Sequence, residues 1–462
     1  MDLFNELFGS RMGDNIIFTP QKIALEMIEA LPAEIWNRHT KFLDPCCKSG
    51  IYLQEIRNKL MACDDLIEAY PDEQDRLEHI DTNQLYGLAI NENCLLLSTR
   101  NVCGRLTADS NIRYIQNYIQ KVKDKNTDYK ELIKEELGEV KFDVVIGNPP
   151  YQDGSRSIYP KFIDLGIQVS SRIVTMIVKN NWLTSDDMQS TRENMLGAGL
   201  NRIISYPLNR EVFTGVNVNV NIFNVDKLNS NCQKIQFTEI KNGNIVEQHT
   251  INARNTPIIL KNKAEESIVL KVLNSSDFKC YQENVGTSNP FGVETNFNKA
   301  TGFGMPLVDK IDDSNNIKIV HMHKGKPAYV YTAKENIEKG TDKIGDYKVI
   351  CGEKLHKNST VISNVHAIGS NSICTGSWAL LYSSKSRDKT INAYHYIRTK
   401  FFRFLVGLMC SDGGMARPTK YRFSLVPTQT LGETWTDDKL YKKYNLTPDE
   451  IDYIEKTIKP MK

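Results

Sequence analysis

The chain has 462 residues, of which 40% are hydrophobic and 25% charged, a composition typical of a globular protein with two or three domains. Its formal net charge of +2 excludes a globally basic surface. No stretch approaches the roughly 20 apolar residues that span a bilayer, and the first residues lack the pattern of a signal peptide. We therefore expect a cytoplasmic protein without a membrane segment. The ten cysteines include no C-x-x-C pair, which predicts reduced thiols and no metal site.

The first half of the chain alternates helical patterns with short apolar runs, which predicts a doubly wound α/β domain. Thr19 and Pro20 have the residue types of an N-cap and a first helical position, and Ile23 and Met27 follow at helical spacing. The candidate strands are residues 41–43, 85–90, 142–147, 172–178, 203–206 and 216–225, and a further helix is predicted over residues 159–171. Residues 111–139 carry apolar residues at helical spacing and then alternating charges, which predicts a helix pair without a site.

The composition shifts at about residue 226 toward Asn, Lys, Gly, Ser and Thr, with short β-like runs separated by turn residues. This predicts a second, mixed α+β domain over residues 226–430. A C-terminal helical segment is expected over residues 431–462, because Thr447, Pro448 and Glu450 have the pattern of a capped helix start. The predicted division of the chain is therefore 1–225, 226–430 and 431–462.

Three of the candidate strands end in a polar residue where the chain should turn into a loop, at Asp44, Asn91 and Asn148. In an open α/β sheet, ligands bind just beyond the carboxyl ends of the strands. A single Asp-Pro or Asn-Pro step is more often a structural turn. Three polar strand ends in series predict a shared site.

The sharpest pattern in the sequence is the run Asn148, Pro149, Pro150 and Tyr151. An exocyclic aromatic amine is a poor nucleophile because its lone pair is delocalised into the ring. The Asn148 side-chain oxygen and the Pro149 carbonyl can accept its two N–H bonds and free that lone pair for attack on an activated methyl group. Tyr151 offers a flat face for a base flipped out of a duplex. This chemistry works by positioning and electrostatics and needs no side-chain nucleophile.

Residues 142–151 (Phe-Asp-Val-Val-Ile-Gly-Asn-Pro-Pro-Tyr) resemble the catalytic motif of amino-methyltransferases. Residues 18–24 (Phe-Thr-Pro-Gln-Lys-Ile-Ala) and 43–50 (Leu-Asp-Pro-Cys-Cys-Lys-Ser-Gly) precede it. This order resembles the gamma class of N6-adenine DNA methyltransferases of bacterial restriction–modification systems, and the motifs cover roughly residues 15–225. The resemblance implies a Rossmann-like catalytic domain dependent on S-adenosyl-L-methionine, followed by a target-recognition domain.

The resemblance also implies a function and a set of site residues. The expected reaction is methyl transfer from S-adenosyl-L-methionine to the N6 amino group of a flipped adenine in double-stranded DNA. The catalytic residues would be Asn148, Pro149, Pro150 and Tyr151. The cofactor-binding residues would be Phe18, Thr19, Asp44, Pro45, Cys46, Gly50, Asn91 and Asp109. Phe213 stands where the class often has an aromatic that packs on the flipped base with Tyr151; a core phenylalanine is the alternative.

A cluster of six cations between residues 391 and 431 is the candidate DNA contact of the second domain. Arg417, Lys420 and Arg422 are the members expected to bind DNA. A solvated basic face is the alternative reading of the whole cluster. Part of it, residues 401–408, also has the pattern of a buried helix.

Two departures from the class concern the cofactor site. Lys48 replaces a glycine that is usual in the cofactor loop, and it would change the loop or place a cation near the cofactor carboxylate. Ala89 stands where an acidic residue usually holds the ribose hydroxyls, so Asn91 or Glu92 would have to take that role.

Several alternatives remain open at this point. Protein-glutamine and ribosomal RNA guanine methyltransferases carry the same tetrapeptide but generally lack a long second domain, and the amino-cytosine branch usually has another residue in place of Asn148. The chain could be the methyltransferase part of a restriction system whose cleavage comes from a separate endonuclease. A fused nuclease is not indicated, since residues 342–354 lack a clean nuclease arrangement. A decayed, DNA-binding specificity protein is the non-enzymatic alternative.

Overall fold

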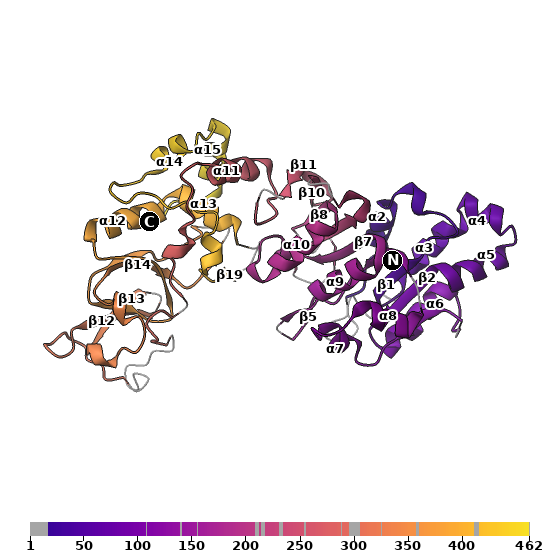
Figure 1. Cartoon of the computed structure of the whole chain (residues 1–462), viewed down its shortest axis with the longest axis horizontal. Helices are drawn as coiled ribbons and strands as arrows, with labels where there is room; N and C mark the ends of the chain where they lie inside the picture. The colour runs from indigo at the N-terminus through magenta and orange to yellow at the C-terminus, as the bar shows by residue number, and fades with distance from the viewer. Residues whose placement is uncertain are drawn as a thin grey trace. The chain divides into compact units, whose positions relative to one another are not determined.

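The computed structural model describes residues 17–461 except 108, 139–140, 155, 208–211, 214–217, 231–233, 254–255, 288, 295–304, 325, 357–359 and 411–414. The chain forms two compact units (Figure 1). The first unit comprises Met1–Leu183 and Asp187–Pro257, and the second comprises Thr184–Asp186 and Ile258–Lys462. Each unit has its own apolar core.

The first unit is built on a nine-stranded sheet. Its strands are β1 (Phe42–Cys47), β2 (Leu85–Ala89), β3 (Asn111–Tyr114), β4 (Phe142–Gly147), β7 (Ser170–Lys179), β8 (Leu200–Tyr206), β9 (Val220–Asp226), β10 (Lys234–Lys241) and β11 (Asn244–Asn252). Their order across the sheet is β11-β10-β8-β9-β7-β4-β1-β2-β3. The run from β3 to β7 is parallel, and β9 is antiparallel to both of its neighbours. A small hairpin, β5 (Gln152–Asp153) and β6 (Arg156–Ser157), follows β4.

Nine helices are described in the first unit, the first of them before β1 and the others between strands of the sheet. They are α2 (Gln21–Glu29), α3 (Ile51–Met61), α4 (Asp64–Ala69), α5 (Glu73–His79), α6 (Glu92–Cys103), α7 (Tyr118–Lys123), α8 (Tyr129–Leu137), α9 (Tyr159–Val169) and α10 (Gln189–Ala198). α3 packs against α2 and α6, whereas α9 packs against α7, α8 and α10. Because α3, α6 and α9 each join two parallel strands, every such strand ends at the same edge of the sheet. The predicted Rossmann-like fold is therefore confirmed.

The segment predicted as a helix pair, residues 111–139, is only partly helical. α7 and α8 confirm two helices, but residues 111–114 form the edge strand β3, and residue 139 lies outside the described part. The helical reading rested on the spacing of Ile112 and Ile115, and both are buried. A four-residue strand followed by a turn places them on the core just as a helix would, because such a short segment satisfies both periods.

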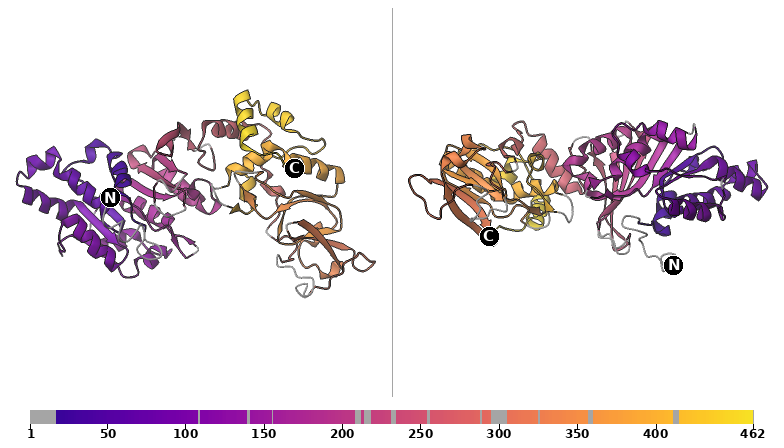
Figure 2. Two further views of the ribbon diagram at one scale, coloured as in Figure 1. Left: turned by 180° about the vertical axis from the view of Figure 1, so that it is seen from behind. Right: turned by 90° about the horizontal axis from the view of Figure 1, so that it is seen from below.

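The second unit contains three small sheets, shown from two further sides in Figure 2. One consists of β12 (Ile317–His323), β13 (Lys326–Thr332) and β17 (Ser372–Cys374). The others are β14 (Tyr347–Gly352), β16 (His366–Ile368) and β18 (Trp378–Ser384), and the pair β15 (Leu355–His356) and β19 (Met415–Ala416). Its helices are α11 (Lys263–Leu273), α12 (Arg387–Arg398), α13 (Lys400–Leu408), α14 (Asp437–Lys443) and α15 (Pro448–Thr457). Across the described residues of both units, no helix has the length and hydropathy of a bilayer span.

The core of the second unit is centred on α13. Every residue from Phe401 to Leu408 is buried, and α13 packs against α12, α14 and α15. The alternative reading of residues 401–408 as a buried helix is therefore confirmed, and the mixed α+β class of this unit agrees with the prediction. The capping box predicted at Thr447 and Glu450 is also present at the start of α15.

The boundaries between the parts differ from the predicted ones. The first unit extends to Pro257, beyond the predicted end at residue 225, because β10 pairs with β8 and β11 completes the same sheet. Residues 431–462 form α14 and α15 as predicted, but they belong to the core of the second unit rather than to a separate segment.

Candidate functional site

The carboxyl ends of β1 and β4 bring two of the predicted polar strand ends together. The two strands are adjacent and parallel, with Phe42 opposite Val144. A Cβ atom added to Gly147 would lie 2.9 Å from Oδ1 of Asp44, so the missing side chain lets the carboxyl group approach the end of β4. Asn148 follows directly. This edge is where a doubly wound sheet binds its ligands.

The Asn148 side chain is 3% exposed and its two polar atoms are used differently. Nδ2 donates hydrogen bonds to the Ile17 carbonyl, 3.3 Å away, and to Thr19 Oγ1, 3.2 Å away. Oδ1 is buried and has no hydrogen-bond partner among the described residues. Because both N–H bonds of the amide are engaged, the orientation of Oδ1 is fixed, and this oxygen can accept a hydrogen bond from a ligand.

Thr19 has a different role from the predicted one. Pro20, not Thr19, occupies the N-cap of α2, and no side chain caps this helix. The Thr19 hydroxyl instead accepts from Asn148 and lies 3.3 Å from the Tyr52 hydroxyl, which donates to it. The residue thus links the segment before α2 to the end of β4.

The cofactor loop predicted at residues 43–50 runs from the end of β1 to the start of α3. Asp44 Oδ1 accepts the Cys46 amide hydrogen at 2.9 Å, and the Pro45 carbonyl accepts from the Tyr118 hydroxyl at 2.9 Å. Burial raises the pKa of Asp44 to about 7, against the opposing effects of the Cys46 amide and the Lys48 ammonium. Gly50 has a φ of 79° and lies against Val102, where a Cβ atom would come within 2.9 Å of Cγ2.

Lys48 is buried in the same loop, with 6% of its surface exposed. Its ammonium donates to the Ile17 carbonyl at 2.9 Å, the same oxygen that accepts from Asn148. Burial lowers the pKa of Lys48, while Cys46 and Asp44 act in the opposite direction. Lys48 thus fastens the segment before α2 onto the cofactor loop, a contact that the usual glycine could not make.

Both apolar and polar side chains surround the carboxyl end of β2. Phe18 packs in a small apolar cluster with Ala89 and Cys94. Asn91 caps α6, its side chain accepting the Cys94 amide hydrogen at 2.8 Å. Glu92 is exposed and lines a hollow of about 930 Å³ along α6 and β3. The predicted cofactor residues Phe18 and Asn91 therefore lie at the carboxyl edge of the sheet, although the Asn91 oxygen already has a partner.

Asp109 is not brought to this edge. It precedes β3, at the amino end of that strand, and its exposed carboxylate accepts from the Thr107 hydroxyl at 3.2 Å. The residues that follow β3 at the carboxyl edge are Ile115 to Tyr118, where Asn117 has a φ of 57° and Tyr118 binds the Pro45 carbonyl. Sequence reasoning missed them, although the β-branched and aromatic residues from Ile112 to Tyr114 could have signalled the strand.

The aromatic residues predicted to hold a base are both buried. Tyr151 is 7% exposed, its hydroxyl has no partner among the described residues, and the Lys179 ammonium lies 6.0 Å from its ring centroid. Phe213 is 1% exposed and belongs to the same apolar cluster as Tyr151. Pro149 and Pro150 are buried as well. This placement agrees equally with a pocket wall and with the core alternative for Phe213.

The predicted cation cluster of the second unit divides into two kinds of residue. Arg403 is 1% exposed and donates to main-chain carbonyls, so it is part of the core, and Lys400 pairs with Glu455. The solvated-face alternative is thus wrong for Arg403. The expected DNA-contacting residues lie nearer the surface. Arg417 is 3.3 Å from Glu353, Lys420 is 3.6 Å from Glu283, and Arg422 has a buried Nη1 without a partner in the described part of the chain.

Comparison with known proteins finds similarity to methylases, mainly within the first unit. Residues 83–213 match the Eco57I restriction-modification methylase family. An uncharacterized adenine-specific methylase of Mycoplasma pneumoniae is 22% identical over 242 residues, which are 38% of this chain and 57% of that protein. The type ISP restriction-modification enzyme LlaGI, solved as a nuclease-deletion mutant with a DNA substrate mimic, aligns with a TM-score of 0.55 at 11% identity. That alignment covers 88% of this chain and 46% of the enzyme.

The ATP-dependent type ISP enzyme LlaBIII bound to DNA aligns with a TM-score of 0.50 at 12% identity, over 82% of this chain and 34% of that chain. The chain thus spans about half the length of the relatives it matches. The family match contains β4 and residues 148–151, and it confirms the resemblance over residues 83–213. The structural likenesses concern the fold.

Proposed function

We propose that the chain is a site-specific DNA methyltransferase that transfers a methyl group from S-adenosyl-L-methionine to the N6 amino group of a flipped adenine. The observation that carries the proposal is the Asn148 amide, whose Oδ1 is buried without a partner at the carboxyl end of β4. A restriction–modification context is supported by the family match over the residues around it.

The Asn148 amide is prepared for its role before the substrate arrives. Its Nδ2 is held by Ile17 and Thr19, so Oδ1 points at one place and accepts one hydrogen of the adenine amino group without reorganisation. The Pro149 carbonyl is the proposed second acceptor, and Pro149 has no N–H group to compete. Two such hydrogen bonds localise the nitrogen lone pair. When bound, S-adenosyl-L-methionine supplies a methyl group made electrophilic by its positively charged sulfur.

The residues around Asp44 fit the amino-acid part of this cofactor. That part carries an ammonium and a carboxylate group, and the loop presents a carboxyl group at Asp44 and an ammonium at Lys48, both buried. Thr19, Pro45, Cys46 and Gly50 complete the proposed cofactor set at this end, with Phe18 and Asn91 at the end of β2. Since Asp109 lies at the opposite edge, Asn117 and Tyr118 take its place in the proposal.

The target adenine is proposed to be flipped from double-stranded DNA toward Tyr151 and Phe213. Tyr151 follows Asn148 by three positions in the sequence, and Phe213 belongs to the same apolar cluster as Tyr151. In the second unit, Arg417, Lys420 and Arg422 are the proposed phosphate contacts. Their present acidic neighbours, Glu353 and Glu283, form long surface ion pairs that phosphates could replace at little cost.

The deciding experiment is methyl transfer from labelled S-adenosyl-L-methionine to unmethylated genomic DNA, followed by nucleoside analysis of the product. N6-methyladenine is the expected product. Labelled 4-methylcytosine, or transfer to protein or RNA but not to DNA, would refute the assignment of the target.

A second candidate is a DNA-binding protein whose methyltransferase site has decayed, and the features that favour it are Lys48 and Ala89. It predicts sequence-specific DNA binding without measurable binding of S-adenosyl-L-methionine. Calorimetric titration of the cofactor separates the two candidates. A Lys48→Gly variant that binds the cofactor where the parent chain does not would identify Lys48 as the cause. Either candidate leaves room for cleavage by a separate restriction endonuclease.

A further inference from the structure

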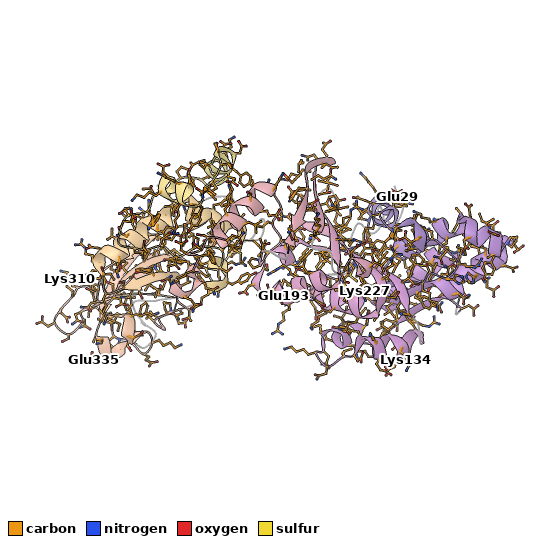
Figure 3. All side chains as sticks on the ribbon, turned by 45° about the horizontal axis from the view of Figure 1, so that its top comes forward. Glu29, Lys134, Glu193, Lys227, Lys310 and Glu335 are labelled. Carbon is orange, nitrogen blue, oxygen red and sulfur yellow. The ribbon has the colours of Figure 1, made fainter. Side chains whose placement is uncertain are left out.

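A second hollow, of about 600 Å³, lies at the amino ends of β4 and β7, at the edge of the sheet opposite to Asn148. It forms where α8, the end of α9 and the segment after β9 meet. Its lining includes Lys130, Lys134, Lys141, Lys227, Ile133 and Val169, of which Lys134 and Lys227 are labelled in Figure 3. Among the described residues that line it there is no aspartate or glutamate.

The four lysines come from three parts of the chain and line the same hollow. Lys130 and Lys134 are one turn apart on α8, Lys141 directly precedes β4, and Lys227 follows β9. No ion pair is formed by Lys130, Lys141 or Lys227 within the described ranges. Burial lowers the pKa of Lys227, and the positive charges of Lys130 and Lys141 lower it further. Like charges gathered without a neutralising partner raise the local potential and attract anions.

Lys227 is held in place by the main chain. Its ammonium donates to the carbonyls of Ile167 and Ser170. An ammonium has three N–H bonds, so one remains for a ligand. Asp143, at this end of β4, accepts hydrogen bonds from the Ser171 hydroxyl at 2.8 Å and the Lys41 amide at 3.0 Å. The hollow therefore has a fixed cation, and its described lining residues supply no carboxylate to neutralise it.

The hollow and the proposed site at Asn148 lie at opposite edges of the sheet. A six-residue strand is about 20 Å long, so the two ends of β4 lie on opposite sides of the unit. The hollow's volume falls in the range of about 300–1,000 Å³ typical of small-molecule sites. Three or four ammonium groups match the charge of a di- or triphosphate, and the buried side chains of Ile133 and Val169 add an apolar wall.

We propose that the hollow lined by Lys130, Lys141 and Lys227 binds a polyphosphate group, carried either by a nucleoside triphosphate or by an inorganic polyphosphate. The site is separate from the proposed methyltransferase centre and does not depend on it.

The test is calorimetric titration of the whole chain with ATP and, separately, with tripolyphosphate at low ionic strength. Both titrations are made with S-adenosylhomocysteine present in excess, so that the adenosine part of ATP cannot enter the proposed cofactor site. The variant is the double charge reversal Lys130→Glu/Lys141→Glu. Its matched control, Lys22→Glu/Lys389→Glu, changes the net charge equally at two exposed lysines that do not line the hollow.

We expect both probes to bind the parent chain, and the Lys130→Glu/Lys141→Glu variant to bind them at least about tenfold more weakly. The control should bind as the parent does. Tighter binding of ATP than of tripolyphosphate assigns the site to a nucleotide, and equal binding assigns it to the phosphate chain alone. Absence of binding by the parent, or equal binding by variant and control, overturns the proposal. So does a loss of duplex DNA binding that accompanies the loss of polyphosphate, because the lysines would then be DNA contacts.

Discussion

Asn148 differs from the other buried asparagines of the first unit in how its side chain is satisfied. Asn221 donates to Asn180 at 2.7 Å and accepts from the Trp182 indole at 3.2 Å, so both of its polar atoms are paired. Asn148 is paired only at Nδ2. An unpaired buried acceptor costs about 1–3 kcal/mol, and a fold keeps one where a ligand later supplies the missing donor.

Replacing Asn148 by alanine should lower kcat by about 100- to 1,000-fold, the usual effect of removing one preorganised hydrogen-bonding group. The affinity for S-adenosyl-L-methionine should change little, because the loop around Asp44 is intact. Single-turnover methyl transfer and cofactor titration measure the two quantities. Asn201→Ala is the control, since Asn201 pairs with Asn224 elsewhere in the same sheet. Unchanged turnover in Asn148→Ala would remove the basis of the proposed mechanism.

Asp44 should make stability depend on pH in an unusual direction. Burial raises its pKa from 3.8 to about 7 in the folded state, so between these values the folded chain holds more protons than the unfolded one. The stabilising contribution is thus complete below about pH 4 and is lost as the pH rises through 7. Relative to Asp44→Asn, the parent should lose up to about 1.4 kcal/mol per pH unit over this window. Urea unfolding of both proteins from pH 5 to pH 8 measures the difference in their free energies of unfolding. A difference that stays the same across this pH range would contradict the prediction.

At the scale of single residues, the sequence predicted which polar side chains end the strands but not the contacts that they make within the fold. The types and spacing around Asp44 and Asn148 place them at one edge, because parallel strands end together. The sequence could not predict the contacts of Thr19 with Asn148 and of Lys48 with Ile17, because they join residues 129 and 31 positions apart and depend on where the segment before α2 lies in the fold.

At the element scale, the predicted role of Asn91 can be tested through its position as the N-cap of α6. Its side chain satisfies the Cys94 amide, and loss of such a cap costs about 1 kcal/mol. Asn91→Ala should therefore lower the free energy of unfolding by about that amount, whereas Asn91→Asp should keep it and also supply the acidic group that the class usually has near Ala89. Urea unfolding measures the first effect and cofactor titration the second. Asn93→Ala, at an exposed position of the same helix, is the control. An equal loss of unfolding free energy in the control would mean that the Asn91 cap does not stabilise the helix.

The failure at Asp109 also belongs to the element scale. The resemblance placed this residue, which follows Leu106 and Thr107, in the cofactor site. Strand β3 begins only at Asn111, and its alternation is too short to stand out in the sequence. A slip of one loop is enough to move a residue from the carboxyl to the amino edge of a sheet, so single edge strands are where such predictions fail.

α13 carries one buried cation, Arg403, and one cation nearer the surface, Lys400, and we expect the buried one to contribute more to stability. The Arg403 guanidinium donates to the carbonyls of Thr360 and Lys459, at 3.0 and 2.7 Å, and to two carbonyls at the end of α12. Arg403→Met leaves these acceptors unpaired and should cost about 3 kcal/mol or more. Lys400→Met breaks only the pair with the partly exposed Glu455 and should cost about 1 kcal/mol or less. Chemical denaturation of the two variants compares them; similar costs would mean that the carbonyl contacts contribute little.

At the scale of the whole molecule, the sequence predicted three parts, whereas the chain forms two compact units and the first of them ends later than predicted. The boundary was placed where the composition changes, at residue 226. β11 is an edge strand that is exposed over much of its length, yet β10 and β11 complete the sheet of the first unit. A polar composition indicates that a strand is exposed, but it does not indicate to which domain the strand belongs.

The position of the boundary can be tested with two truncated chains, one ending at residue 225 and one at residue 257. Ile235, Phe237 and Ile251 are all at most 1% exposed, and burying each such side chain contributes about 2 kcal/mol. A chain ending at residue 225 lacks all three and leaves β8 without its neighbour β10, so it should aggregate or unfold at a much lower temperature than residues 1–257. Residues 1–257 should unfold in one cooperative transition and bind S-adenosyl-L-methionine without binding DNA tightly, because the proposed phosphate contacts lie beyond the cut. Calorimetry of both truncated chains makes the comparison. If the chain ending at residue 225 were as stable as the longer one, β10 and β11 would be an appendage, and the boundary expected from composition would be the correct one.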